Sequence, residues 1–92
     1  MKVIYKAPGQ TQEIREISKK LEDLQAAVGG RIETVTFSPD FVVIGNEESR
    51  LLDLPYNCTV FGVAFFGPIL IVGSSGEEFT SLKPYIMSQL MQ

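Results

Sequence analysis

Residues 54–76 form a run of 23 residues without a charged side chain, which is long enough for a membrane-spanning helix. The composition of the run argues against such a helix, because Gly62, Gly67 and Pro68 interrupt its apolar centre. The residues on either side of these breaks are mainly β-branched and aromatic, and such residues favour strands. The run therefore predicts a strand, a turn and a buried strand, and no membrane span.

The length and composition of the chain further restrict its possible folds and functions. With 92 residues, of which 45% are hydrophobic and 21% charged, it is predicted to form one globular domain, residues 1–92. It has one cysteine, Cys58, and no histidine, which excludes an internal disulfide, a histidine-dependent triad and the usual zinc ligand sets. We therefore expect neither catalytic residues nor a cofactor. Residues 1–6 lack the apolar core of a signal peptide, which predicts a cytoplasmic protein.

The net charge of −3 is unevenly distributed along the chain. Residues 1–31 carry six bases and four acids, a balance of +2, whereas residues 32–92 carry two bases and seven acids, a balance of −5. An acidic chain is a poor match for a phosphate backbone, so nucleic acid is not the expected partner. The basic first third leaves nucleic-acid binding open as an alternative, through Lys2, Lys6, Arg15, Lys19 and Lys20.

Turn signals and apolar patterns predict the order of the secondary structure. Residues 2–17 are predicted to form a β-hairpin around Pro8-Gly9. Ser18 is the predicted N-cap of a helix that ends at two consecutive glycines, Gly29 and Gly30. Further strands are predicted at 32–37, 41–44 and 69–72, loops at 46–49 and 73–76, and a final helix from about Pro84. The resulting order, ββαββ…βα, predicts an α+β fold with a mainly antiparallel sheet and two short helices.

Four aliphatic residues of the two most apolar predicted strands should be almost fully buried: Val42, Ile44, Ile69 and Ile71. One face of the sheet should be covered by the stripe of the first helix, which consists of Leu21, Leu24 and Val28. The last third of the chain holds more apolar side chains than one sheet and two short helices are expected to cover. We therefore expect a homodimer that associates through the C-terminal helix, with its Ile86/Leu90 and Met87/Met91 pairs, or through Phe65-Phe66.

A first polar cluster extends from Asn46 to Asn57. Amides and an arginine can hold a polar ligand, because arginine forks onto carboxylates or phosphates and asparagine both donates and accepts. The candidate ligand-binding residues are Asn46, Glu47, Glu48, Arg50 and Asn57. The competing interpretation is a hairpin turn with solvated acids.

A second polar cluster, residues 76–82, places hydroxyls after a glycine-rich loop and resembles a phosphate cradle. It lacks the glycine spacing and the lysine of a P-loop. Its candidate ligand-binding residues are Glu78, Thr80 and Ser81. If the two clusters meet in space, Glu47/Glu48 and Glu77/Glu78 would supply paired carboxylates for a hard cation, which makes a metal-dependent enzyme an alternative.

The sequences of these clusters, NEESRLLDLPYN at 46–57 and IVGSSGEEFTSL at 71–82, resemble the signatures of a short family known only as a domain of unknown function. Similarity extends to Pro8-Gly9 and to the leucine-containing helix before Gly29-Gly30. Members of the family occur in bacteria, phages and mobile elements, often with a glycine where this chain has Asp53. The resemblance implies an intracellular accessory protein and brings no catalytic residues with it.

These observations favour a small non-catalytic binding or interaction protein, encoded by a phage, a mobile element or its host. Its partner is expected to be a host protein, bound in a counter-defence role, or a small nucleotide ligand. The metal-dependent enzyme and the nucleic-acid-binding protein remain the alternatives.

Overall fold

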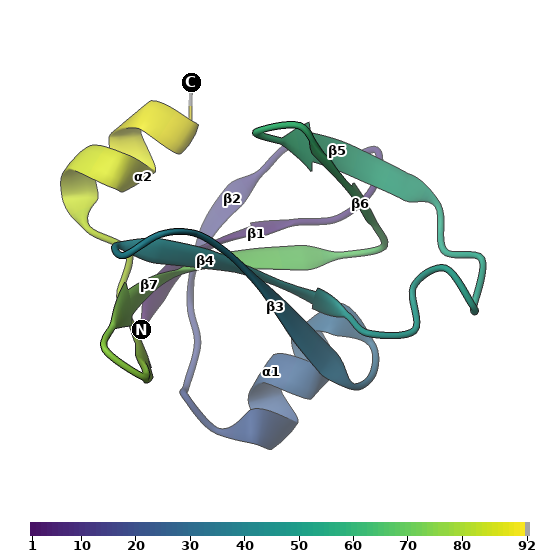
Figure 1. The fold of residues 1–92 in the computed structure, drawn as a ribbon, viewed down its shortest axis with the longest axis horizontal. Helices are drawn as coiled ribbons and strands as arrows, with labels where there is room; N and C mark the ends of the chain where they lie inside the picture. The colour runs from purple at the N-terminus through teal and green to yellow at the C-terminus, as the bar shows by residue number, and fades with distance from the viewer. Residues whose placement is uncertain (92) are drawn as a thin grey trace.

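A computed structural model describes residues 1–91 and has the predicted α+β class (Figure 1). Eight strands and two helices follow one another in the described chain. They are β1 (Lys2–Lys6), β2 (Glu13–Glu16), α1 (Leu21–Val28), β3 (Ile32–Ser38), β4 (Phe41–Asn46), β5 (Tyr56–Val60), β6 (Val63–Phe66), β7 (Ile69–Ser75), β8 (Glu78–Thr80) and α2 (Pro84–Leu90). The predicted 2–17 hairpin is confirmed as β1 and β2.

The main sheet has the strand order β2-β1-β7-β4-β3, with β8 pairing along the end of β7, and all its pairs are antiparallel. At its centre, Ile71 of β7 lies opposite Ile4 of β1 on one side and Val43 of β4 on the other. Strands β5 and β6 form a separate two-stranded sheet. Strand β7 therefore joins two hairpins from distant parts of the sequence, β1–β2 and β3–β4.

Strands β4 and β7 are apolar along most of their length because both faces of the sheet are covered. On one face, α1 packs on a cluster that includes Val42 and Ile44. On the other face, α2 and Phe65 of the β5–β6 hairpin pack on a cluster that includes Ile69 and Ile71. The side chains of these four strand residues are at most 5% exposed, which confirms their predicted burial.

The predicted stripe of α1 is correct for two of its three residues. Leu24 and Val28 are buried against the sheet, whereas Leu21 is 56% exposed. Leu21 is the first residue of a helix of only eight residues, and the buried contacts with the sheet begin one turn later, at Leu24. The expectation that Leu21 covers the sheet is therefore wrong.

The ends of α1 differ in how well the sequence predicts them. Gly29 ends the helix with a left-handed φ of 82°, as expected for a glycine C-cap. Ser18 is not the N-cap, because Lys20 takes that position without a side-chain capping bond. Ser18 Oγ instead accepts a hydrogen bond from the backbone N–H of Lys20 and contacts the Asp23 carboxylate. Ser18 thus orders the turn that precedes the helix.

The uncharged run holds more strands than the sequence predicts. Residues 54–76 contain β5, β6 and β7, and a tight turn at Phe61-Gly62 joins β5 to β6 with φ angles of 45° and 82°. Such a turn favours asparagine, aspartate or glycine at its first position, so a phenylalanine there conceals the hairpin. Among residues 1–91, no helix is long and apolar enough to cross a membrane.

The predicted loop at 73–76 is also wrong, because its first three residues continue β7 and pair with β8. A Cβ atom on Gly73 would lie 2.3 Å from the carbonyl oxygen of Ser81. Only glycine permits this close approach of the two backbones. Gly73, which suggested a loop, is thus required for the pairing of β7 with β8.

Candidate functional site: an apolar groove beside the β5–β6 hairpin

The structure separates the two predicted polar clusters. Asn46 is the last residue of β4 and lies at the end of the sheet where β7 begins, whereas Glu77 and Glu78 follow the opposite end of β7. The register places Gly76 about eight strand positions from the level of Asn46, which corresponds to roughly 26 Å. Within residues 1–91, no group of three His, Cys, Asp or Glu side chains is placed to hold a metal ion. The two glutamate pairs therefore do not form the shared site expected for a metal-dependent enzyme.

Asn46 is a buried contact between α1 and the following turn. Its side chain donates to the carbonyl oxygen of Val28 at 3.2 Å and accepts from the backbone N–H of Glu48 at 2.8 Å. A Cβ atom on Gly30 would lie 3.0 Å from the Asn46 amide nitrogen, so Gly30 makes room for this amide. Asn46 closes the end of the sheet where the sequence predicts an exposed loop.

Asn57 joins the β5–β6 hairpin to the main sheet. Its side-chain nitrogen donates to the carbonyl oxygens of Lys6 and Gly67, both at 2.8 Å. Its side-chain oxygen accepts from Lys6 Nζ at 2.9 Å. With 7% exposure, this amide is a structural contact that also fixes the position of the Lys6 ammonium.

The remaining predicted ligand residues lie nearer the surface. The guanidinium carbon of Arg50 lies 4.2 Å from the centre of the Phe66 ring, and the carboxylate of Glu47 lies 4.0 Å from the Arg31 guanidinium. Ser81 Oγ accepts a hydrogen bond from the backbone N–H of Lys2 at 2.8 Å, and Thr80 Oγ1 donates to the Ser81 carbonyl oxygen. Glu48 is half-buried, and Glu78 is exposed. The role of this set in ligand binding stays a prediction.

The basic residues of the first third do not share one face. Along β1 the side chains alternate, so Lys2 and Lys6 lie on the same face as Ile4, whose side chain packs in the α2 cluster. The guanidinium of Arg15 stacks over the Tyr5 ring at 3.8 Å, and Tyr5 packs with the α1 cluster. The basic residues are therefore divided between the two sides of the sheet.

A groove that the sequence does not reveal lies between the C-terminal part of α2 and the β5–β6 hairpin. It has a volume of about 290 Å³, and its floor is formed by Ile69 and Ile71 of β7. The other apolar lining residues are Cys58, Val60, Phe61 and Leu90, and the polar ones are Lys6, Gln12 and Thr59. These residues come from five separate segments, so spacing along the chain carries no sign of the groove.

Lys6 places a positive charge at this groove. Its Nζ is held by Asn57, and among residues 1–91 no carboxylate oxygen lies within 4.0 Å of it. Gln12 closes another part of the groove by donating from its side chain to the carbonyl oxygen of Leu90 at 2.7 Å. The groove thus combines apolar walls with one cation that has no acidic partner in the described chain.

Cys58 lines the groove, and its thiol is partly buried there. Burial raises the pKa of its thiol, while the nearby charge of Lys6 lowers it to a smaller extent. At neutral pH the thiol is therefore mainly protonated and reacts slowly. As the one cysteine of the chain, it offers a site-specific probe of whether the groove is occupied.

A surface ion pair helps to hold α2 in position as one wall of the groove. Lys83, which precedes α2, bonds through Nζ to the Asp40 carboxylate in the turn between β3 and β4, at 2.8 Å. This hydrogen bond, together with the charge of Lys83, lowers the pKa of Asp40. The contact fixes the start of α2 against the edge of the sheet.

The Asp40–Lys83 contact is expected to make part of the stability dependent on acid. Because the pKa of Asp40 is lower in the folded chain, its contribution is present above the pKa of the unfolded carboxyl and disappears as the pH falls through the folded value. Asp40→Asn should reduce the loss of unfolding free energy between neutral and acidic pH, as measured by urea denaturation. Glu22→Gln, at an exposed acid in α1, is the control. Its slope of unfolding free energy against pH should stay closer to that of the original protein. An unchanged slope in Asp40→Asn would contradict the assignment.

Comparison with known proteins agrees with the resemblance seen in the sequence. Searches of curated proteins and of solved structures give no significant match. The family model described as "Domain of unknown function (DUF3846)" matches residues 1–92, which is the whole chain. The chain therefore belongs to the DUF3846 family.

Proposed function

We propose that this protein is a non-catalytic binding protein whose ligand occupies the groove between α2 and the β5–β6 hairpin. The observation that carries the proposal is the pairing of apolar walls with Lys6, a cation held in place without an acidic partner in the described chain. Binding sites for small molecules typically combine such walls with a few placed polar groups. A ligand with an apolar body and one anionic group matches both features.

This chemistry argues against one of the ligands expected from the sequence, the small nucleotide. A nucleotide needs hydrogen-bonding groups for its base, sugar and phosphates, whereas the walls of the groove are mostly aliphatic, aromatic or thiol. An amphipathic carboxylate, or the apolar C-terminus of a host peptide, needs only the walls and Lys6. We therefore place the small amphipathic anion ahead of the nucleotide.

The biological setting of this binding role is also part of the proposal. The similarity to a family found in bacteria, phages and mobile elements supports an accessory protein, and a counter-defence role is consistent with a small binding domain. The exposed aromatic side chain of Phe61, at the rim of the groove, supplies a further apolar contact for such a partner.

The test uses a fluorescent probe of matching chemistry, 8-anilinonaphthalene-1-sulfonate. Lys6→Met keeps most of the apolar length of the side chain but removes the charge, and it should weaken probe binding by about tenfold, the value of one charge-assisted hydrogen bond. Lys6→Arg should restore most of the affinity. Lys19→Met, at an exposed lysine before α1, is the matched control and should bind the probe normally.

Two further measurements assign the site. The uncharged probe N-phenyl-1-naphthylamine should bind the original protein and Lys6→Met equally well, because it uses only the apolar walls. Bound sulfonate probe should slow the alkylation of Cys58 by a maleimide. Equal binding of the sulfonate probe by Lys6→Met and the original protein would overturn the proposal, as would alkylation of Cys58 at the same rate with and without bound probe.

A further inference from the structure

Apart from the three-residue strand β8, which pairs with one end of β7, the main sheet ends in two edge strands of different character. The β2 edge carries three charged side chains in four residues, Glu13, Arg15 and Glu16. Such charges protect an edge from pairing with another chain. The β3 edge has Glu33 as its only charged residue and contains no proline. Of the two edges, β3 is therefore the one suited to accept another strand.

The register identifies which backbone groups of β3 point away from the sheet. The backbone N–H of Glu47 donates to the carbonyl oxygen of Arg31 at 2.8 Å, so these two residues form a hydrogen-bonded pair. In an antiparallel ladder such pairs alternate with non-hydrogen-bonded ones. It follows that Ile32, Thr34 and Thr36 direct their backbone N–H and C=O groups toward the free edge. In the described chain, β3 pairs with β4 alone.

We propose that the β3 edge binds the β3 edge of a second copy of this chain, antiparallel and with a twofold axis at Thr34. The residues with outward-facing backbone then oppose one another: Thr34 lies opposite Thr34 of the second copy, and Ile32 lies opposite Thr36 of the second copy. Each such pair can exchange two backbone hydrogen bonds. The two main sheets become one continuous sheet.

The sequence of β3 fits a twofold axis at Thr34 better than an axis at the neighbouring residue, Glu33. The regular β3–β4 register shifts after Thr36, so the straight part of the edge is Ile32 to Thr36, which is symmetric about Thr34. In this register Glu33 lies opposite Val35 of the second copy. An axis at Glu33 would place two glutamates opposite one another, which is unfavourable. Thr34 facing its own copy is a favourable cross-strand pair.

The β3 edge is a different surface from the dimer surfaces expected from the sequence. Phe65, Ile86 and Met87 are each at most 8% exposed, because the β5–β6 hairpin and α2 bury them within one chain. These three side chains offer little further area to a second copy, whereas Phe66, Leu90 and Met91 are half-buried, so association through α2 or Phe65-Phe66 stays a prediction. The unpaired backbone of β3 is available without any rearrangement of the core.

Sedimentation equilibrium over a range from nanomolar to high micromolar concentration tests the proposal. The original protein should shift toward twice the chain mass of 10.2 kDa as its concentration rises. Thr34→Pro removes one outward N–H without breaking a β3–β4 hydrogen bond, and it should weaken dimerisation by about tenfold or more. In hydrogen exchange, the amides of Ile32 and Thr36 should be protected more strongly at high concentration.

Ile14→Pro is the matched control on the opposite edge. Met1 and Ile17 exchange two backbone hydrogen bonds, so the same alternation directs the N–H of Ile14 outward. This variant should dimerise like the original protein, and both proline variants should keep the native circular dichroism spectrum. A protein that remains at 10.2 kDa at high micromolar concentration would overturn the proposal. A dimer of undiminished affinity in folded Thr34→Pro would also overturn it.

Discussion

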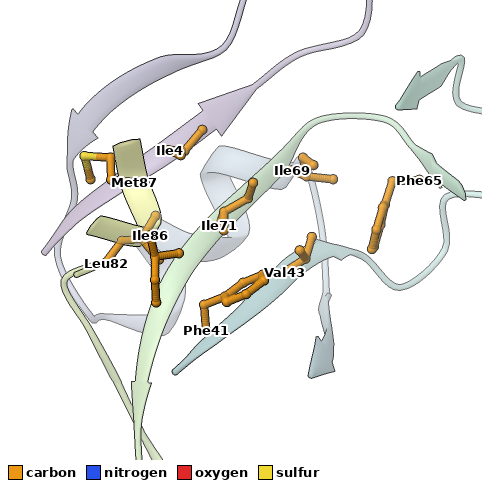
Figure 2. Packing of buried hydrophobic residues seen from close by; sticks show 9 residues of the cluster. All are labelled: Ile4, Phe41, Val43, Phe65, Ile69, Ile71, Leu82, Ile86 and Met87. Carbon is orange, nitrogen blue, oxygen red and sulfur yellow. The ribbon is translucent and has the colours of Figure 1, made fainter. Parts of the chain in front are cut away.

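Truncation of Ile71 to alanine is expected to lower the free energy of unfolding by about 2–5 kcal/mol. Ile71 is 5% exposed and lies on the central strand β7, between Ile4 and Val43. Figure 2 shows its side chain in the middle of the cluster that α2 covers. Removal of its outer carbons leaves a cavity that the paired strands on both sides prevent from collapsing. Urea denaturation followed by circular dichroism measures the change.

Val63→Ala is the matched control for this truncation. Val63 is also an aliphatic strand residue, but it is 37% exposed and lies in the two-stranded β5–β6 sheet. Its truncation should cost less than about 1 kcal/mol. Similar costs for the two variants would show that Ile71 does not occupy the centre of the core. A cost below about 1 kcal/mol for Ile71→Ala would contradict its central position directly.

Substitution of Asn57 by alanine is expected to cost about 2–3 kcal/mol of unfolding free energy in the absence of any ligand. The change leaves the carbonyl oxygens of Lys6 and Gly67 without their donor, and the latter bond is buried. It also releases Lys6 Nζ, so the affinity for the sulfonate probe should fall together with the stability. Thermal and urea denaturation of the ligand-free protein give the first quantity, and the probe titration gives the second.

Two companion variants separate the structural role of Asn57 from a role as ligand. Thr59→Ala, at an exposed position of the same strand, should change stability by no more than about 0.5 kcal/mol. Asn57→Asp keeps the size of the side chain but turns a carboxylate toward two carbonyl oxygens, so it should destabilise at neutral pH and recover in part on acidification. If Asn57→Ala lost probe binding at unchanged stability, Asn57 would be a ligand residue, as the sequence suggests.

The structure explains the roles of several residues on which the family resemblance is based. Asp53 has a φ of 53°, in the left-handed region that glycine adopts at little cost, so the backbone at this position suits a glycine. The amides of Asn46 and Asn57 each satisfy backbone groups from distant segments. From the sequence alone these asparagines are candidate ligand residues, and only the structure shows that both are buried.

The missed hairpin shows where local reasoning could have gone further. Tyr56 to Phe66 carries strand-forming residues on both sides of Gly62, and a glycine between two such segments is a hairpin signal. The phenylalanine at the first turn position hid that signal, since a left-handed φ is unfavourable for it. The ring of Phe61 lies 5.8 Å from that of Phe37, a contact that helps to offset the strain and that no local pattern reveals.

The sequence by itself determined the α+β class, the two apolar central strands and the glycine end of α1. Each of these depends on the preferences of residues close together in the chain: apolar runs require cover on both faces, and a glycine accepts a left-handed φ. Only the tertiary structure decided where the buried amides lie, which strands form the edges of the sheet, and that α2 and the β5–β6 hairpin enclose a groove beside Lys6. The reason is that each of these features combines segments far apart in the chain. Their meeting is set by how the whole core packs, which no spacing within one segment encodes.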